Sequence, residues 1–224
     1  MNTSYRSSAN RRIHSCLIGA FIAACIPLVA HAQAILLGTL PMTGAGNSTM
    51  TPGDRFAFSF TTPATAYTLN NVIVPLFGYD PTGDTVLLGF YTDTGVPGTL
   101  VGSLLTNPAG QGAVTSDYTF TPASTITFSP NTTYWMVFGV DAGTVYFQQS
   151  SLTGTTPIGD ATFGNFKLTG NSGANWFDYT ATMGGQFEFQ INATAVPEPS
   201  TYAALTSAAV LVFAAYRRRQ KQSA

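Results

Sequence analysis

Apolar and polar residues alternate through the middle of this 224-residue chain. Phe56, Phe58 and Phe60 are separated by smaller residues, and residues 187–191 repeat the same spacing. A period of two places alternate side chains on one face of a strand, so such a segment buries one face of a sheet and is unsuited to a helix. Residues 33–195 show no helical periodicity and no internal repeat, so we expect them to form one β domain.

Further stretches of strand length are separated by turn sequences. Asp80-Pro81-Thr82-Gly83 and Asp93-Thr94-Gly95 combine residues that favour a reversal of the chain. About ten short strands at this spacing predict an all-β fold for residues 33–195, an antiparallel β-sandwich that is jelly-roll-like. The further stretches are residues 69–77, 85–92, 99–105, 113–121, 133–140, 144–150 and 161–168.

The first 32 residues have the layout of a secretory signal peptide. Three arginines precede an apolar stretch, residues 13–29, and Ala30-His31-Ala32 is an A-x-A cleavage pattern. We therefore expect the chain to be exported and residues 1–32 to be removed as a signal peptide. A lipoprotein cleavage box that ends at Cys25 competes with this site, so cleavage at Cys25 and cleavage after Ala32 both remain open.

The basic residues lie mostly in the two terminal segments, which hides the charge of the part between them. The whole chain has nine Lys and Arg against ten Asp and Glu, a formal net charge of −1. Between the signal peptide and the C-terminal tail, only Arg55 and Lys167 are basic, whereas all ten acidic residues lie there, so 2 − 10 gives −8. Phosphate contacts need Lys and Arg, so we expect no binding of nucleic acid.

Both histidines and both cysteines lie within the first 32 residues. Once that segment is removed, the chain lacks a disulfide, the general base of Ser-His-Asp and Cys-His catalysis, and the ligands of His-based metal sites. A carboxylate pair of the glycosidase kind is still formally possible. Most of the aspartates, however, stand close to Gly or Pro, where Asp commonly stabilises a turn. We therefore expect a non-enzymatic protein that uses no cofactor.

Asp80 and Asp84 flank one turn and are weak candidates for a calcium site. Oxygen-rich loops suit Ca²⁺, but the spacing here is not that of an EF-hand. Asp residues in turns more commonly accept hydrogen bonds from nearby backbone. The expected role of both residues is therefore structural, and no metal is predicted.

Aromatic residues near the end of the domain are candidates for glycan binding. Trp176 and Tyr179 follow a loop at residues 170–173. Sugar rings stack on exposed aromatic faces, and neighbouring Asn and Asp side chains can bond to their hydroxyl groups. The interpretation we favour is that Trp176 and Trp135 fill the sandwich, as large aromatic residues usually do.

The C-terminal segment, residues 196–221, combines three features in a fixed order. Val196-Pro197-Glu198-Pro199 comes first, an uncharged stretch at residues 201–216 follows, and a basic tail at residues 217–221 begins with Arg217, Arg218 and Arg219. As a helix, the uncharged stretch would be about 24 Å long, against roughly 30 Å of bilayer hydrocarbon. Because flanking arginines can snorkel to the headgroups, we expect one transmembrane helix with its arginines in the cytoplasm and the domain outside.

This ordered combination resembles the PEP-CTERM sorting signal of exopolysaccharide-producing Gram-negative bacteria. In that family the signal is recognised by exosortase, a membrane-embedded cysteine transpeptidase-like enzyme that processes proteins near the motif. The resemblance implies exosortase as a partner, an intermediate tethered to the inner membrane, and a final place at the cell surface or in the extracellular matrix of a biofilm. The two prolines hold the motif extended, which suits entry into a processing site.

The domain itself is similar to the choice-of-anchor β-domains, particularly the type R set. Residues 92–104 and 131–137 carry this resemblance, residues 187–191 fit the closing strand, and the match covers roughly residues 50–195. The resemblance implies a surface module that can be joined to different anchors, and no activity of single residues. The expected function is that of a non-enzymatic surface or matrix protein. The alternative is a module that binds glycan or exopolysaccharide and uses the same anchor.

Overall fold

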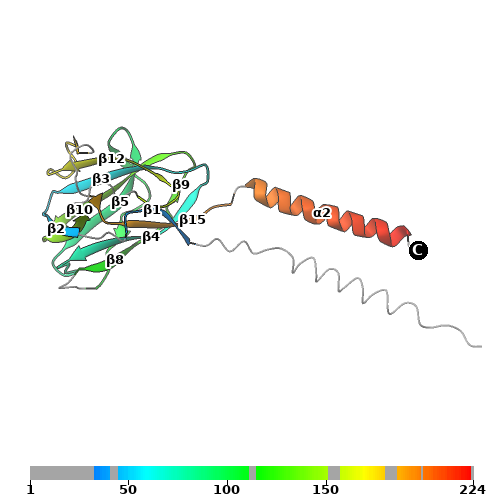
Figure 1. Cartoon of the computed structure of the whole chain (residues 1–224), viewed down its shortest axis with the longest axis horizontal. Helices are drawn as coiled ribbons and strands as arrows, with labels where there is room; N and C mark the ends of the chain where they lie inside the picture. The colour runs from blue at the N-terminus through cyan, green and yellow to red at the C-terminus, as the bar shows by residue number, and fades with distance from the viewer. Residues whose placement is uncertain are drawn as a thin grey trace, which may run out of the picture. The chain divides into compact units, whose positions relative to one another are not determined.

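A computed structural model describes residues 33–40, 45–110, 115–150, 157–179, 186–197 and 199–222 (Figure 1). The chain divides into two compact units, one of which is the continuous segment His31–Val196. The other comprises Met1–Ala30 and Pro197–Ala224. The predicted signal peptide and Glu198 lie outside the described residues.

The described part of the domain consists of β-strands and their connections, and every strand pair in it is antiparallel. A nine-stranded sheet runs in the order β1-β15-β4-β11-β14, with β2, β7, β8 and β9 attached to it, and a six-stranded sheet runs β13-β12-β3-β10-β5-β6. The strands are β1 (Gln33–Gly38), β2 (Ala45–Met50), β3 (Arg55–Thr61), β4 (Tyr67–Phe77), β5 (Thr85–Asp93), β6 (Pro97–Leu100), β7 (Leu105–Thr106), β8 (Ser116–Pro122), β9 (Thr127–Phe128), β10 (Thr133–Ala142), β11 (Val145–Ser150), β12 (Thr162–Thr169), β13 (Phe177–Asp178), β14 (Gln186–Phe187) and β15 (Gln190–Ala195).

Aromatic rings from both sheets meet in the interior and hold the sheets together. Phe58 on β3 has its ring centroid 5.3 Å from that of Phe187 on β14, and Phe60 on β3 lies 5.6 Å from Phe128 on β9 at an interplanar angle of 86°. Tilted and edge-to-face contacts of this kind add to the free energy of burying apolar area. The alternation of Phe56, Phe58 and Phe60 therefore marks the buried face of β3, and the predicted antiparallel all-β sandwich is confirmed.

Most predicted strands lie where the alternation placed them, and two of them are divided. The stretch at residues 99–105 forms β6 and β7, which pair with different partners, β5 and β8. Gly102 lies between them with φ of +73°, a conformation that interrupts a strand. The closing stretch at residues 187–191 is also divided, because β14 ends at Phe187 and β15 begins at Gln190.

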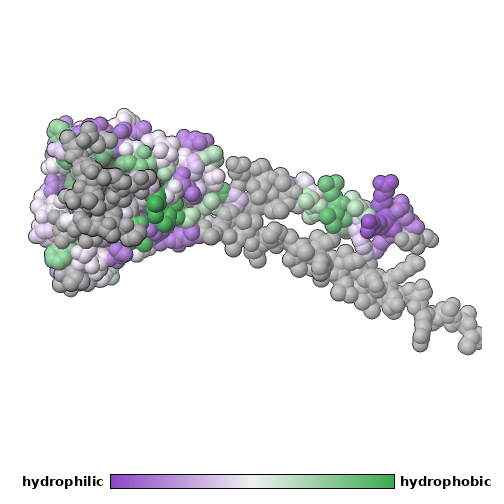
Figure 2. Space-filling model, in the orientation of Figure 1, coloured by the Kyte–Doolittle hydropathy of each residue, from purple (hydrophilic) through white to green (hydrophobic). Residues whose placement is uncertain are grey.

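The C-terminal unit contains a helix, α2 (Pro199–Gln222), of 24 residues. Its side chains at Val210, Leu211 and Val212 are 66, 70 and 63 % exposed, and the arginines follow within two turns (Figure 2). In the part of the chain that the structure describes, no helix is long and apolar enough to cross a membrane. The prediction of a helix at residues 201–216 is confirmed, but its assignment as a transmembrane span is not supported.

Candidate functional site

The six-stranded sheet carries a second apolar cluster on its outer face. Trp135 and Val137 on β10 are buried there with Ala57 on β3. Their neighbours along β10, Tyr134 and Met136, belong to the interior cluster. Because side chains alternate across a strand, Trp135 and Val137 point away from the nine-stranded sheet. Three partly buried residues complete the outer-face cluster, namely Leu87, Tyr91 and Trp176.

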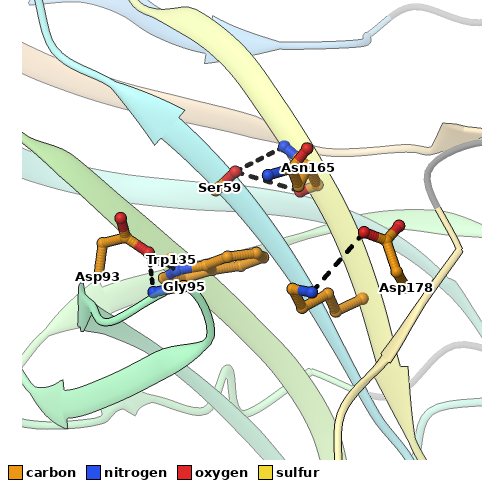
Figure 3. A network of polar contacts seen from close by, with 7 residues as sticks. Ser59, Asp93, Gly95, Trp135, Asn165 and Asp178 are labelled. Atoms are coloured by element: carbon orange, nitrogen blue, oxygen red, sulfur yellow. Dashed lines mark hydrogen bonds and ion pairs between the residues drawn. The ribbon is translucent and has the colours of Figure 1, made fainter.

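Trp135 is the fixed centre of this outer-face cluster. It lies opposite Tyr91 on β5 and opposite Ser59 on β3. Its indole Nε1 donates a hydrogen bond of 2.7 Å to Asp93 Oδ1, and Gly95 N donates one of 2.9 Å to the same oxygen (Figure 3). Asp93 therefore stabilises the β5–β6 turn, and the same carboxylate oxygen is the hydrogen-bond acceptor that the buried indole N–H needs.

Trp135 is buried, as expected, but neither tryptophan belongs to the cluster between the sheets, so that part of the expectation is wrong. Trp135 is only 1 % exposed, but it belongs to the outer-face cluster. Trp176, in the loop before β13, is half-buried against the same cluster. The inward positions of β10 are instead taken by residues that include Tyr134, Met136 and Phe138. The parity of positions along β10 excludes Trp135 from the interior.

The structure also separates the two residues of the predicted glycan platform. Tyr179 N donates a hydrogen bond of 3.1 Å to Phe166 O, so Tyr179 continues the pairing of β13 with β12. Strand alternation then places its side chain on the side opposite Asp178, whereas Trp176 shares the outer face. Tyr179 is 40 % exposed at the sheet edge. The companions of Trp176 are therefore Tyr91 and Trp135, which the sequence analysis did not associate with it.

Two ion pairs flank the outer-face cluster. Lys167 on β12 lies 3.7 Å from Asp178 on β13, with side chains 14 % and 59 % exposed (Figure 3). The buried Arg55 pairs with Asp141 and also donates hydrogen bonds of 2.9 Å to Asp54 O and 2.6 Å to Val140 O. These two cations are the only basic residues between positions 33 and 216 of the sequence, and both are engaged by carboxylates.

Tyr91 and its surroundings determine the hydrogen-bonding character of the surface. Burial raises the pKa of Tyr91; the positive charge of Arg55 acts in the opposite direction and Asp141 reinforces the rise. The phenol is therefore a neutral hydroxyl that can both donate and accept at physiological pH. Asp93 and Asn165 are exposed beside the cluster, and Ser59 Oγ accepts a 2.6 Å hydrogen bond from Asn165 N. The face presents rings, a hydroxyl group and carboxylates together.

Asp80 and Asp84 are engaged with the backbone of their own turn. Asp80 Oδ1 accepts from Thr82 N at 2.9 Å, and Asp84 Oδ2 accepts from Asp80 N at 2.8 Å. The second oxygen of Asp84 accepts from Thr144 N at 3.1 Å. Across the described ranges, no group of three or more His, Cys, Asp or Glu side chains is arranged to hold a metal ion. The carboxylates therefore have the geometry of turn residues.

The described residues of the predicted sorting motif stand where the sequence passes from one unit to the other. Val196 N donates a 2.8 Å hydrogen bond to Ala66 O, which extends the pairing at the end of β15. Pro199 is the first residue of α2. Arg217, Arg218 and Arg219 are exposed near the other end of the helix, and the Arg217 guanidinium lies 5.6 Å from the Phe213 ring centroid.

Glu188 is a buried carboxyl that the sequence analysis did not single out. It lies between β14 and β15 and is 2 % exposed, and its Oε1 has no hydrogen-bond partner among the residues that the structure describes. Burial, with a smaller contribution from the negative charge of Asp117, raises its pKa to about 7. Its alternation with Phe187 and Phe189 indicated a solvent-facing position, and the sequence holds no signal of what covers it.

Comparisons of the chain with protein-family models and with curated proteins found no match. Its function is therefore argued from the arrangement of its own residues. Among the described residues, the outer-face cluster with its flanking charges and the C-terminal segment that follows Val196 are the parts on which a function can be based.

Proposed function

We propose that this chain is an exported, non-enzymatic protein of the cell surface or extracellular matrix, delivered by its C-terminal segment, residues 196–221, to an exosortase-type enzyme. The domain is a jelly-roll-like module carried by this signal. The observation that supports the proposal most directly is the independence of the domain from the segment. His31–Val196 is a compact unit, and all described members of its interior cluster lie between Leu36 and Ala195.

The junction between the units suits removal of the segment. The last hydrogen bond of the sheet is made by Val196, and α2 begins at Pro199. Pro197 has no N–H to donate, and Pro199 at the first helical position loses no intrahelical hydrogen bond. A cut within or after the motif would therefore remove α2 with its exposed apolar residues and arginines, and would leave every pair of the sheet intact.

Mass spectrometry of the surface material tests this proposal. In a host that carries an exosortase, we expect the intact mass of the mature protein to lack the segment after about Pro199. The same host without the enzyme should accumulate protein that retains the segment, and serves as the control. Matrix protein that still carries Arg217, Arg218 and Arg219 in the exosortase-bearing host would refute the proposal.

Binding of glycan or exopolysaccharide, with the same anchor, is the second candidate function. The observation in its favour is the outer-face cluster, where half-buried Tyr91 and Trp176 flank Trp135. Sugar rings stack on aromatic faces of this kind.

Stability and retention measured on the same variants separate this candidate from a purely structural role. Replacing the buried Trp135 with Ala should destabilise the domain by about 3–5 kcal/mol, the range for a buried large aromatic residue. Trp176→Ala should lose about 1–2 kcal/mol, since only part of its area is buried. Urea titrations measure both losses. Trp176→Ala should also lose retention on exopolysaccharide. Unchanged retention would show that Trp176 contributes only to packing.

A further inference from the structure

We infer that the outer face of the six-stranded sheet binds an uncharged polysaccharide, along a strip in which the half-buried Tyr91 and Trp176 present their rings and the buried Trp135 supports them. The inference rests on the glycan-binding candidate above and names the class of its ligand. The three residues come from β5, β10 and the loop before β13, so the strip runs across the strands rather than along one of them. A strip across several strands suits an extended chain of sugar rings better than a single small molecule.

The strip is organised before any ligand arrives. The Trp135 indole is held by its 2.7 Å hydrogen bond to Asp93, and it packs with Ala57 and Val137 beneath the two outer rings. Lys167 and Asp178 pair beside the loop that carries Trp176. A surface whose side chains are already ordered loses little conformational entropy when a ligand binds. Tyr91 and Trp176, each half-buried, keep part of their rings available for stacking.

The charges of this face select against an acidic polysaccharide. Arg55 and Lys167 are both in ion pairs and their side chains are only 7 % and 14 % exposed, so a carboxylate or sulfate on the ligand would meet cations that are largely covered and already compensated. The side chains of Asp141 and Asp178 are 47 % and 59 % exposed, and they repel further negative charge. Sugar hydroxyl groups, in contrast, donate charge-assisted hydrogen bonds to carboxylates. Rings without charge therefore match both the aromatic and the acidic parts of the face.

Affinity electrophoresis of the full-length protein tests the inference. The gels contain a β-glucan, a galactomannan or dextran as uncharged probes, and alginate as a polyuronate, at about 0.15 M salt. The compared proteins are the natural chain, Trp176→Ala, Trp176→Phe, and Tyr146→Ala as a matched control. Tyr146 is an aromatic residue on β11 of the other sheet and is 37 % exposed.

We expect at least one uncharged polysaccharide to retard the natural chain and alginate to leave its mobility unchanged. Trp176→Ala should weaken the apparent affinity at least about tenfold, Trp176→Phe should retain most of it, and Tyr146→Ala should behave as the natural chain. Retardation by alginate alone would overturn the inference while keeping glycan binding. No retardation by any probe would overturn both, and an equal loss in Tyr146→Ala would overturn the placement of the strip. The result does not bear on the sorting proposal, which the mass measurement tests separately.

Discussion

At the scale of single residues, Glu188 shows how strongly burial changes a carboxyl group. It is almost completely buried, no described residue hydrogen-bonds to its Oε1, and its pKa is raised to about 7 by loss of hydration and by Asp117. A carboxylate in such a place is disfavoured, so the folded domain holds Glu188 in its neutral form up to about neutral pH. Close to pH 7 the side chain is near its midpoint, where small changes in pH alter its charge.

We predict that Glu188 makes the domain less stable as the pH rises. The folded pKa of about 7 lies above the ordinary value of 4.5, so the protonated group favours the folded state. This stabilisation is complete below about pH 4.5 and is lost as the pH rises through about 7. Above that pH, Glu188 causes no further change in the free energy of unfolding. A shift of this size corresponds to at most about 3 kcal/mol. Urea titrations at pH 5 and pH 8 measure the loss.

Glu188→Gln is the matched control, because Gln is neutral at both pH values. The difference in unfolding free energy between the natural protein and the variant should shift in favour of the variant from pH 5 to pH 8. Identical pH dependence of the two proteins would contradict the buried, neutral Glu188.

The same scale shows what the sequence can predict about a site. Strand parity assigns Phe58 and Phe60 to the interior, and applied to β10 it would have assigned Trp135 to the outer face. Parity does not reveal which outer positions are covered, which is why Glu188 reads as a surface residue although it is buried. The association of Tyr91 and Trp176 with Trp135 depends on the pairing of β5 with β10 and on the position of the loop before β13, long-range contacts that no local pattern contains.

At the scale of elements, two connections between the sheets are tied together by one side chain. The chain passes from β4 to β5 and again from β10 to β11, each time from one sheet to the other. Asp84 in the first connection accepts hydrogen bonds from Asp80 N at 2.8 Å and from Thr144 N, in the second connection, at 3.1 Å. Gly143 approaches Asp84 closely with φ of +80°. This corner leaves no room for a side chain at position 143.

We predict that Gly143→Ala destabilises the domain more than Gly95→Ala. Both glycines have positive φ, +80° and +83°, so both substitutions incur backbone strain of about 1 kcal/mol. A Cβ at position 143 would overlap the Asp84 carboxylate, whereas one at position 95 would meet nothing within 4 Å. The overlap should add about 2 kcal/mol, because the tie to Thr144 must break or shift. Urea midpoints of the two variants measure the difference. Equal losses of unfolding free energy would show that Asp84 can move away from a Cβ at position 143 without destabilising the domain.

Elements were predicted best where aromatic and β-branched residues alternate. The stretches at residues 69–77 and 133–140 correspond to β4 and β10, with bounds within two residues. β1 and β2 were not predicted, because β1 is almost continuously apolar and β2 (Ala45–Met50) is mostly small and polar. Both are strands because of their partners: β1 pairs with β15, and β2 pairs with β11. Pairing of this kind is a property of the fold rather than of the segment.

At the scale of the whole molecule, the domain should be stable without the C-terminal unit. We predict that a chain ending at Val196 unfolds at the same urea concentration as one that continues to residue 224, since the described interior cluster ends at Ala195. A second truncation, after Phe189, removes β15 and with it the buried Ile191 and Ala193. This chain should not fold. Destabilisation of the first truncation would show that α2 contributes to the domain.

The place of β15 in the sheet also determines when the domain can fold. β15 lies between β1 and β4, so the last strand to be synthesised joins the first strand to the centre of the nine-stranded sheet. Until residue 195 is available, β1 lacks the strand it pairs with and, among the described residues, has only its backbone contacts with residues 158–161, and β4 has an open edge. Contacts between residues so far apart in sequence make folding slow. If the chain crosses a membrane starting from its N-terminus, the domain would therefore stay unfolded until almost all of it has crossed. The nine-stranded sheet would form only when the segment that follows Val196 reaches the membrane.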